Sequence, residues 1–222
     1  MGTASVLQLL FGGYTPPGVS VERRSRAPSA GVWVVLIILA AASFGGWRWW
    51  KRRMLDANER NAADCLETLA TAETDFRAND RDGNRVHDFW TADVAGLHVL
   101  GGPTGVPGQT ASIRLIDARI AEADASHPDA RPFRGYHFRA MDLDEEGVPY
   151  RQETTGNPRR AKEKNTTKFG FCAYPAAYGR TGRWTYVVNE GRTIFKLDTE
   201  GKPVLRFPCD PTAPPTGPKV IE

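Results

Sequence analysis

The sequence predicts an α+β fold in which an N-terminal transmembrane helix continues into a long amphipathic helix. That helix packs on a C-terminal antiparallel sheet of four to five strands. Helical spacing of apolar residues in the first part of the chain and alternating spacing beyond residue 135 predict these two layers. The chain has 222 residues, of which 41% are apolar and 25% charged. This composition excludes a multi-span membrane protein and a wholly disordered chain.

An uncharged apolar run begins the predicted helix. It lies between Arg26 and Arg48, and at about 1.5 Å per residue it reaches roughly 30 Å, the thickness of a bilayer's hydrocarbon core. Tryptophans and cations flank it, as is typical of membrane interfaces. We therefore expect a flexible leader over residues 1–30 and a transmembrane anchor over residues 31–50. The alternative is a cleavable secretory signal.

The residues after this run continue the helix. The stretch from Met54 to Phe76 contains no Gly or Pro, and one face of it is a stripe with steps of three and four: Leu55, Asn58, Ala62, Cys65, Leu69, Ala72 and Phe76. We expect it to form one helix with the anchor, about 45 residues long, which ends at the turn residues Asn79–Asn84.

The rest of the predicted domain, residues 51–208, contains a second helix and the sheet. Apolar spacing predicts a helix over Ala111–Asp124, after a glycine-rich loop over Gly101–Gly108. Alternating residues then predict strands at Tyr136–Ala140, Phe169–Ala173, Trp184–Val188 and Ile194–Leu197, with Val204–Phe207 as a fifth. Residues 209–222 form a Pro-rich tail.

The positive charge is concentrated before the domain. Residues 1–53 hold 7 Lys plus Arg against one acid, whereas residues 54–222 hold 22 against 25. The domain lacks the basic excess of a nucleic-acid-binding protein, and the cations beside the anchor favour anionic lipid. The one basic run in the domain, Arg159 to Lys168, is interleaved with Glu163 and predicts a solvated loop.

One acidic segment has the spacing of a calcium loop. Asp142, Asp144, Glu146 and Glu153 occupy positions 1, 3, 5 and 12 of such a loop, and Gly147 occupies position 6. These four carboxylates are the candidate metal ligands. The alternative is a charged hairpin tip that is kept soluble by its acids.

No other pattern indicates a cofactor, a small-molecule substrate or catalysis. The four histidines are not spaced as zinc ligands, and no serine lies in a nucleophile motif. Two readings are open for the cysteines. They are small core residues, or Cys172 pairs with Cys209 if the domain faces an oxidising compartment.

Three stretches resemble a bacterial, planctomycete-type family of membrane-anchored proteins of unknown function: Glu59–Asn84, His87–Trp90 and Phe169–Gly179. The order of elements, a membrane helix that continues into a long helix before an antiparallel sheet, is similar to that of type IV pilins and pseudopilins. This second resemblance implies a pilin-like domain, and pseudopilins bind calcium as a family.

Together these observations predict a single-pass, non-catalytic envelope protein in the cytoplasmic (inner) membrane, with residues 51–208 on the extracytoplasmic side. Its expected partners are the lipid bilayer and other envelope proteins, in a structural or interaction role. The alternatives are a calcium-stabilised, pilin-like assembly subunit and an envelope enzyme. The enzyme would require a concave pocket that holds titratable side chains with shifted pKa values.

Overall fold

A computed structural model describes residues 30–98, 100–103, 110–152 and 164–211. The leader predicted over residues 1–30 lies outside the described residues apart from residue 30, as does the predicted tail beyond residue 211. The chain divides into two units, residues 1–46 and residues 47–222, and each is described by itself.

The first element is a single long helix, α1 (Ala30–Ala78), which runs without a break through Gly45 and Gly46 and confirms the predicted continuous helix. It ends in a turn in which Asp80 and Gly83 adopt positive φ angles of 45° and 68°. Within the described residues, no helix combines the length and the apolar character that crossing a membrane requires, so the span predicted over residues 31–50 is not confirmed.

A four-stranded antiparallel sheet forms the centre of the second unit. Its strands are β4 (Tyr136–Ala140), β6 (Gly170–Pro175), β7 (Thr185–Asn189) and β8 (Phe195–Leu197), in the order β4-β6-β7-β8. They confirm the first four predicted strands. The fifth is wrong, because the main chain of residues 205–207 bonds to the loop at Asp142 and Leu143 and pairs with no strand of this sheet.

Two further pairs of strands were not predicted. β1 (Phe89–Trp90) pairs with β5 (Lys164–Asn165), and β2 (Leu100–Pro103) pairs with β3 (Thr110–Ile113), both antiparallel. A 3-10 turn, η1 (Ala95–Leu97), lies between β1 and β2.

The predicted second helix is much shorter in the structure. The segment begins as strand β3, and only α2 (Ala118–Glu122) is helical. Asp117 caps α2, because its carboxylate accepts a hydrogen bond from the Arg119 N–H at 2.8 Å. The helix prediction for Ala111–Asp124 is therefore wrong for its first seven and its last two residues, and residues 111–113 pair with β2 through the main chain instead.

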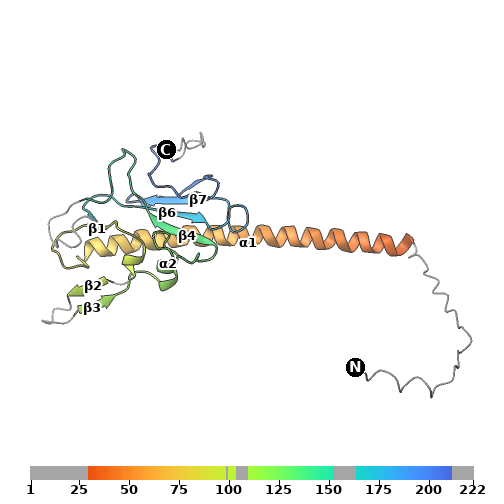
Figure 1. Ribbon diagram of the computed structural model, residues 1–222, viewed down its shortest axis with the longest axis horizontal. Helices are drawn as coiled ribbons and strands as arrows, with labels where there is room; N and C mark the ends of the chain where they lie inside the picture. The colour runs from red at the N-terminus through yellow and green to blue at the C-terminus, as the bar shows by residue number, and fades with distance from the viewer. Residues whose placement is uncertain (1–29, 99, 104–109, 153–163, 212–222) are drawn as a thin grey trace, which may run out of the picture. The chain divides into compact units, whose positions relative to one another are not determined.

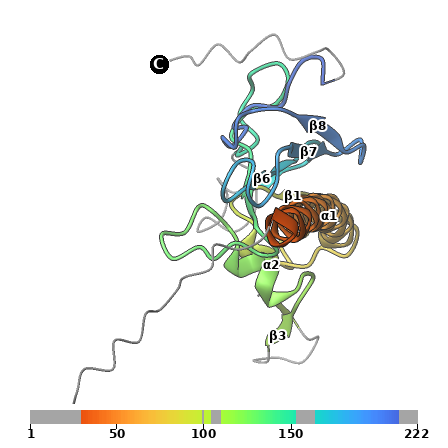
Figure 2. The ribbon, with the colours of Figure 1, turned by 90° about the vertical axis from the view of Figure 1, so that its right-hand side faces the viewer.

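The core lies between α1 and one face of the four-stranded sheet. The sheet is on one side of residues 47–78 of α1, and the β2–β3 hairpin is on the other (Figures 1 and 2). Leu66, Leu69 and Phe76 of α1 are buried in one cluster with Phe138 and Phe171 of the sheet. The predicted stripe is confirmed from residue 62 onward. The opposite face of the sheet is covered by a second cluster: Met141, Tyr150, Cys172, Val187 and Phe207.

Candidate functional site

Among the described residues, the most exposed large apolar side chains lie on the N-terminal part of α1. In the first unit, large apolar side chains are between 56% and 65% exposed: Trp33, Val34, Ile37, Ile38, Leu39 and Phe44. At the start of the second unit, Trp47, Trp49 and Trp50 are 55% to 58% exposed. These positions cover every side of a helix with 3.6 residues per turn. We call residues 33–50 the apolar segment.

Cations border this segment. Arg53 lies over the Trp49 ring, with its guanidinium carbon 4.4 Å from the ring centroid, and the Lys51 ammonium lies 5.9 Å from the Trp47 centroid. Rings and long cationic side chains paired in this way are typical of the boundary between an apolar phase and water.

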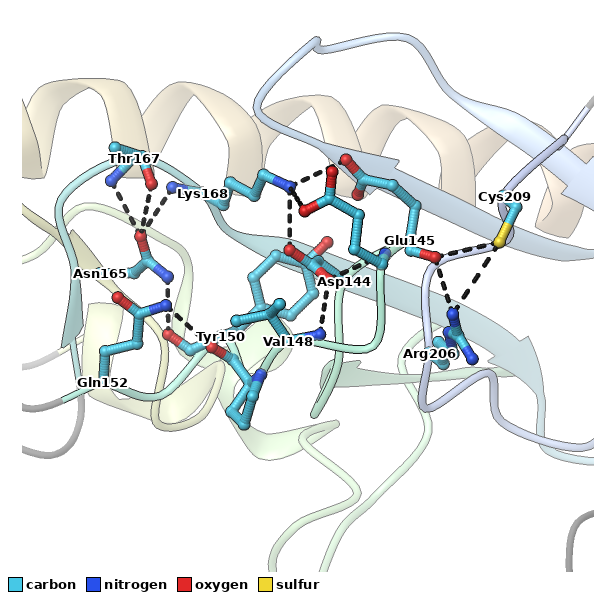
Figure 3. A network of polar contacts seen from close by, with 12 residues as sticks. Asp144, Glu145, Val148, Tyr150, Gln152, Asn165, Thr167, Lys168, Arg206 and Cys209 are labelled. Atoms are coloured by element: carbon cyan, nitrogen blue, oxygen red, sulfur yellow. Dashed lines mark hydrogen bonds and ion pairs between the residues drawn. The ribbon is translucent and has the colours of Figure 1, made fainter.

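The acidic segment that resembled a calcium loop contacts a lysine ammonium. Lys168 Nζ donates to Asp144 Oδ2 and to Glu145 Oε1, at 2.9 Å each (Figure 3). The other oxygen of Asp144 accepts hydrogen bonds from the N–H groups of Glu146 and Val148. Burial acts to raise the pKa of Asp144, but the Lys168 hydrogen bond and these N–H groups outweigh it and hold the pKa below its ordinary value.

The other candidate ligands lie apart from one another around the Lys168–Asp144 ion pair. Glu146 is exposed, with Oε2 3.5 Å from Lys168 Nζ, and Asp142 lies 3.5 Å from Arg139. Glu153 lies outside the described residues. Lys168 therefore lies among the carboxylates that calcium would require, and calcium binding stays a prediction. The sequence pattern missed Glu145, since its spacing does not match the loop.

Of the two alternatives for the cysteines, the pairing of Cys172 with Cys209 is not formed. All three cysteines are free, and Cys172 is buried in β6 while Cys209 is exposed. Cys172 is a core residue, and its burial raises the pKa of the thiol to about 12. Cys209 instead donates a hydrogen bond to the Glu145 carbonyl at 3.0 Å, beside Arg206 (Figure 3).

A second charged cluster is buried. Lys164, which the sequence placed in a solvated loop, is only 1% exposed. Its ammonium contacts Asp82 Oδ2, lies 3.6 Å from Asp88 Oδ1, and lies 4.7 Å from the centroid of the Phe76 ring. Glu73, on α1, is fully buried beside them, and its Oε2 accepts the Trp90 N–H at 2.8 Å. We call Glu73, Asp82, Asp88 and Lys164 the buried lysine cluster.

Carboxyl groups outnumber cations in this cluster, and two of the carboxyl groups have raised pKa values. Burial raises the pKa of Glu73 well above its usual range, against the opposing effects of the Trp90 N–H and the Lys164 charge. Burial also raises the pKa of Asp88, which Lys164 and Asn84 oppose. The cluster therefore places two carboxyl groups with raised pKa values next to a buried amine.

A third group, Asp93, Asp124 and His127, has ligand atoms close enough together to hold a metal ion. Asp124 is fully buried, but its oxygens accept hydrogen bonds from the N–H groups of Val94 and Ala95 and from Ser126. Asp124 thus joins the η1 turn to the end of α2. Its hydrogen bonds account for its burial without an ion.

One surface pocket contains an acid with a shifted pKa. It has a volume of about 720 Å³, and its lining includes Arg77, His87 and Glu190, and also Thr74 and Thr167. Burial raises the pKa of Glu190. His87 Nδ1 is 2.9 Å from the Arg77 carbonyl, and the Thr74 hydroxyl donates to the Ala70 carbonyl within α1. These hydrogen bonds to the main chain do not form a nucleophile and base pair.

The structure defines an α+β protein built on a long N-terminal helix with antiparallel sheets of two and four strands. Residues 45–203 match the DUF2950 family, described as a protein of unknown function, and the chain belongs to that family. This finding confirms the resemblance to an uncharacterised family; the pilin-like resemblance stays a prediction. No curated protein and no solved structure matches the chain.

Proposed function

We propose that this protein is attached to a membrane by the apolar segment of α1 and that its domain has a structural or interaction role in the bacterial envelope. The observation that carries the proposal is the exposure of nine large apolar side chains on all sides of that segment. A helix that is apolar all round is stable only where protein or lipid covers it.

Covering the apolar segment with lipid is expected to be strongly favourable in free energy. Full burial of one such side chain is worth about 1.5–3 kcal/mol, so covering the exposed half of nine is worth on the order of 10 kcal/mol. Arg48 lies near the end of this segment and Lys51, Arg52 and Arg53 follow it, and each cation contributes about 1 kcal/mol beside anionic headgroups. Lipid therefore satisfies both the apolar surface and the adjacent positive charge.

Membrane flotation tests this proposal. The full chain is expressed in bacterial cells, and the lysate is centrifuged through a density gradient before and after washing with high salt and with alkaline carbonate. We expect the chain to float with the membranes and to resist both washes. Recovery of the unmodified chain in the soluble fraction would refute the attachment.

A pair of variants locates the contact. Replacing Ile37 and Ile38 by Asp puts two charges on the apolar segment and is expected to release the chain into the carbonate wash. The matched control replaces Val148 and Leu205, each 42% exposed on the domain, by Asp and should leave flotation unchanged. Equal release of both variants would show that the apolar segment is not the lipid contact.

The extracytoplasmic side remains our proposal for residues 51–208. Protease treatment of intact spheroplasts, with detection of an epitope fused to the C-terminus, reports the side directly. We expect the epitope to be lost from intact spheroplasts. Its protection until the cells are lysed would place the domain in the cytoplasm instead.

A further inference from the structure

The buried lysine cluster contains the components of an amide condensation. Lys164 extends from β5, where it lies opposite Trp90 of β1, and its carbonyl accepts a hydrogen bond from the Gln152 N–H. The amine lies under the rings of Phe76 and Trp90, with 4.7 and 5.7 Å between Nζ and the ring centroids. Its position is therefore set by packing from three segments that are distant in the sequence.

Asp82 is the acceptor that the geometry favours. Its Oδ2 contacts Lys164 Nζ, and its Oδ1 is buried without a hydrogen-bond partner in the described part of the chain. The Asp82 side chain is 11% exposed, whereas Asp88 is completely buried. Asp82 is thus in contact with the amine on one side and near solvent on the other, where a water molecule can leave.

A simple ion pair between Lys164 and Asp82 is costly because both groups are removed from water. Moving an ammonium and a carboxylate out of water carries a desolvation penalty of several kcal/mol for each ion. A neutral amine beside a carboxylic acid carries no such penalty, and these are the forms of the two groups that condense to an amide. The buried Glu73 and Asp88 add further carboxyl groups, and burial raises the pKa of each.

We propose that Lys164 and Asp82 are joined by an intramolecular amide bond that forms when the chain folds. The neutral Lys164 Nζ attacks Cγ of Asp82, a C–N bond forms, and one C–O bond of the carboxylic acid breaks. Asp88, 3.6 Å from Nζ, takes the proton that the nitrogen loses and passes one to the departing oxygen. One amine and one carboxylic acid yield one amide and one water molecule, without an oxidant or a co-reactant.

The bond has a structural consequence. It joins the turn after α1 to β5 and closes a covalent loop of roughly 80 residues, which in the chain-entropy picture restricts the unfolded state as a disulfide would. This proposal is independent of membrane attachment, because every residue that it uses lies in the second unit.

Mass spectrometry of the full chain, denatured and reduced, tests the proposal. We expect the intact mass to be lower than the sequence mass by one water molecule. A tryptic digest should contain a branched peptide in which the segment around Asp82 is joined to Lys164, with no cleavage after Lys164. An intact mass equal to the sequence mass would overturn the proposal.

Variants exclude a second source of the same mass loss. Asp82 precedes Gly83, and an Asp-Gly pair can lose water to form a succinimide without any cross-link. Lys164→Arg abolishes the amide bond but leaves the Asp-Gly pair, so a mass loss that persists in this variant overturns the proposal. The matched control, Lys168→Arg, changes the lysine that contacts Asp144 and should retain the mass loss and the branched peptide.

A further variant tests the assigned proton transfer. Asp88→Asn keeps the volume of the side chain but cannot shuttle a proton, so we expect most of this variant to show the full sequence mass. Unchanged yield of the branched peptide in Asp88→Asn would overturn the role of Asp88. The wild-type digest decides the bond itself, whether or not the variants fold.

Discussion

Two buried tyrosines offer a matched test of the polar contacts in the two core clusters. Tyr136 and Tyr150 are both almost completely buried, at 0% and 1% exposure. The Tyr136 hydroxyl donates to the Trp184 carbonyl at 2.9 Å. The Tyr150 hydroxyl, in contrast, is buried without a hydrogen-bond partner among the described residues. The same substitution to Phe should therefore change stability in opposite directions.

The magnitudes follow from these contacts. Tyr136→Phe removes a hydrogen bond and leaves the Trp184 carbonyl without that donor, which costs about 1–2 kcal/mol. Tyr150→Phe removes a hydroxyl that is desolvated without compensation, which is worth about 1 kcal/mol in favour of the variant. For a chain of this length each kcal/mol corresponds to about 2–4 °C in Tm.

The assay is urea and thermal unfolding of the full chain in detergent, followed by near-UV circular dichroism. We expect Tyr136→Phe to lower the free energy of unfolding and Tyr150→Phe to raise it, with the double variant close to the sum. A loss of stability in both single variants, of similar size, would refute this account of the Tyr150 hydroxyl.

Three further predictions concern packing and charge. Gly170→Ala places a Cβ 2.7 Å from the buried Tyr150 ring and should lower the free energy of urea unfolding by about 1–3 kcal/mol; an unchanged midpoint would contradict the close approach. Lys168→Met removes the hydrogen bond that holds down the pKa of Asp144, so we expect about 1–2 kcal/mol lower stability at neutral pH. The difference from wild type should persist down to about pH 3.8, the ordinary pKa of Asp, and shrink as pH falls below that value; a constant difference in urea unfolding from pH 4 to pH 2 would argue against it. Glu73 has a raised pKa in the folded state, so wild-type stability should fall as pH rises above about 4.5, and Glu73→Gln should lack this loss in a comparison at pH 5 and pH 8.

The sequence alone determined the elements whose pattern is local. The stripe from Ala62 to Phe76 gives one buried helix face, and alternating residues give four strands of the central sheet. Each of these patterns is set by which side chains must leave water, so it can be recognised from spacing. The helix predicted from Ala111 failed because residues 111–113 pair with the neighbouring strand β2 through the main chain, which the spacing of apolar side chains does not report.

Only the tertiary structure decided which charged residues are buried. Lys164 belongs to a run of basic and acidic residues that predicts a solvated loop, yet it contacts Asp82, which lies 82 positions earlier. In the same way, the Lys168 ammonium contacts Asp144 and Glu145 of the acidic segment, although Lys168 lies outside that segment in the sequence. A charged side chain has the same spacing on a surface as in a core, and its burial depends on partners that folding brings together from distant parts of the chain.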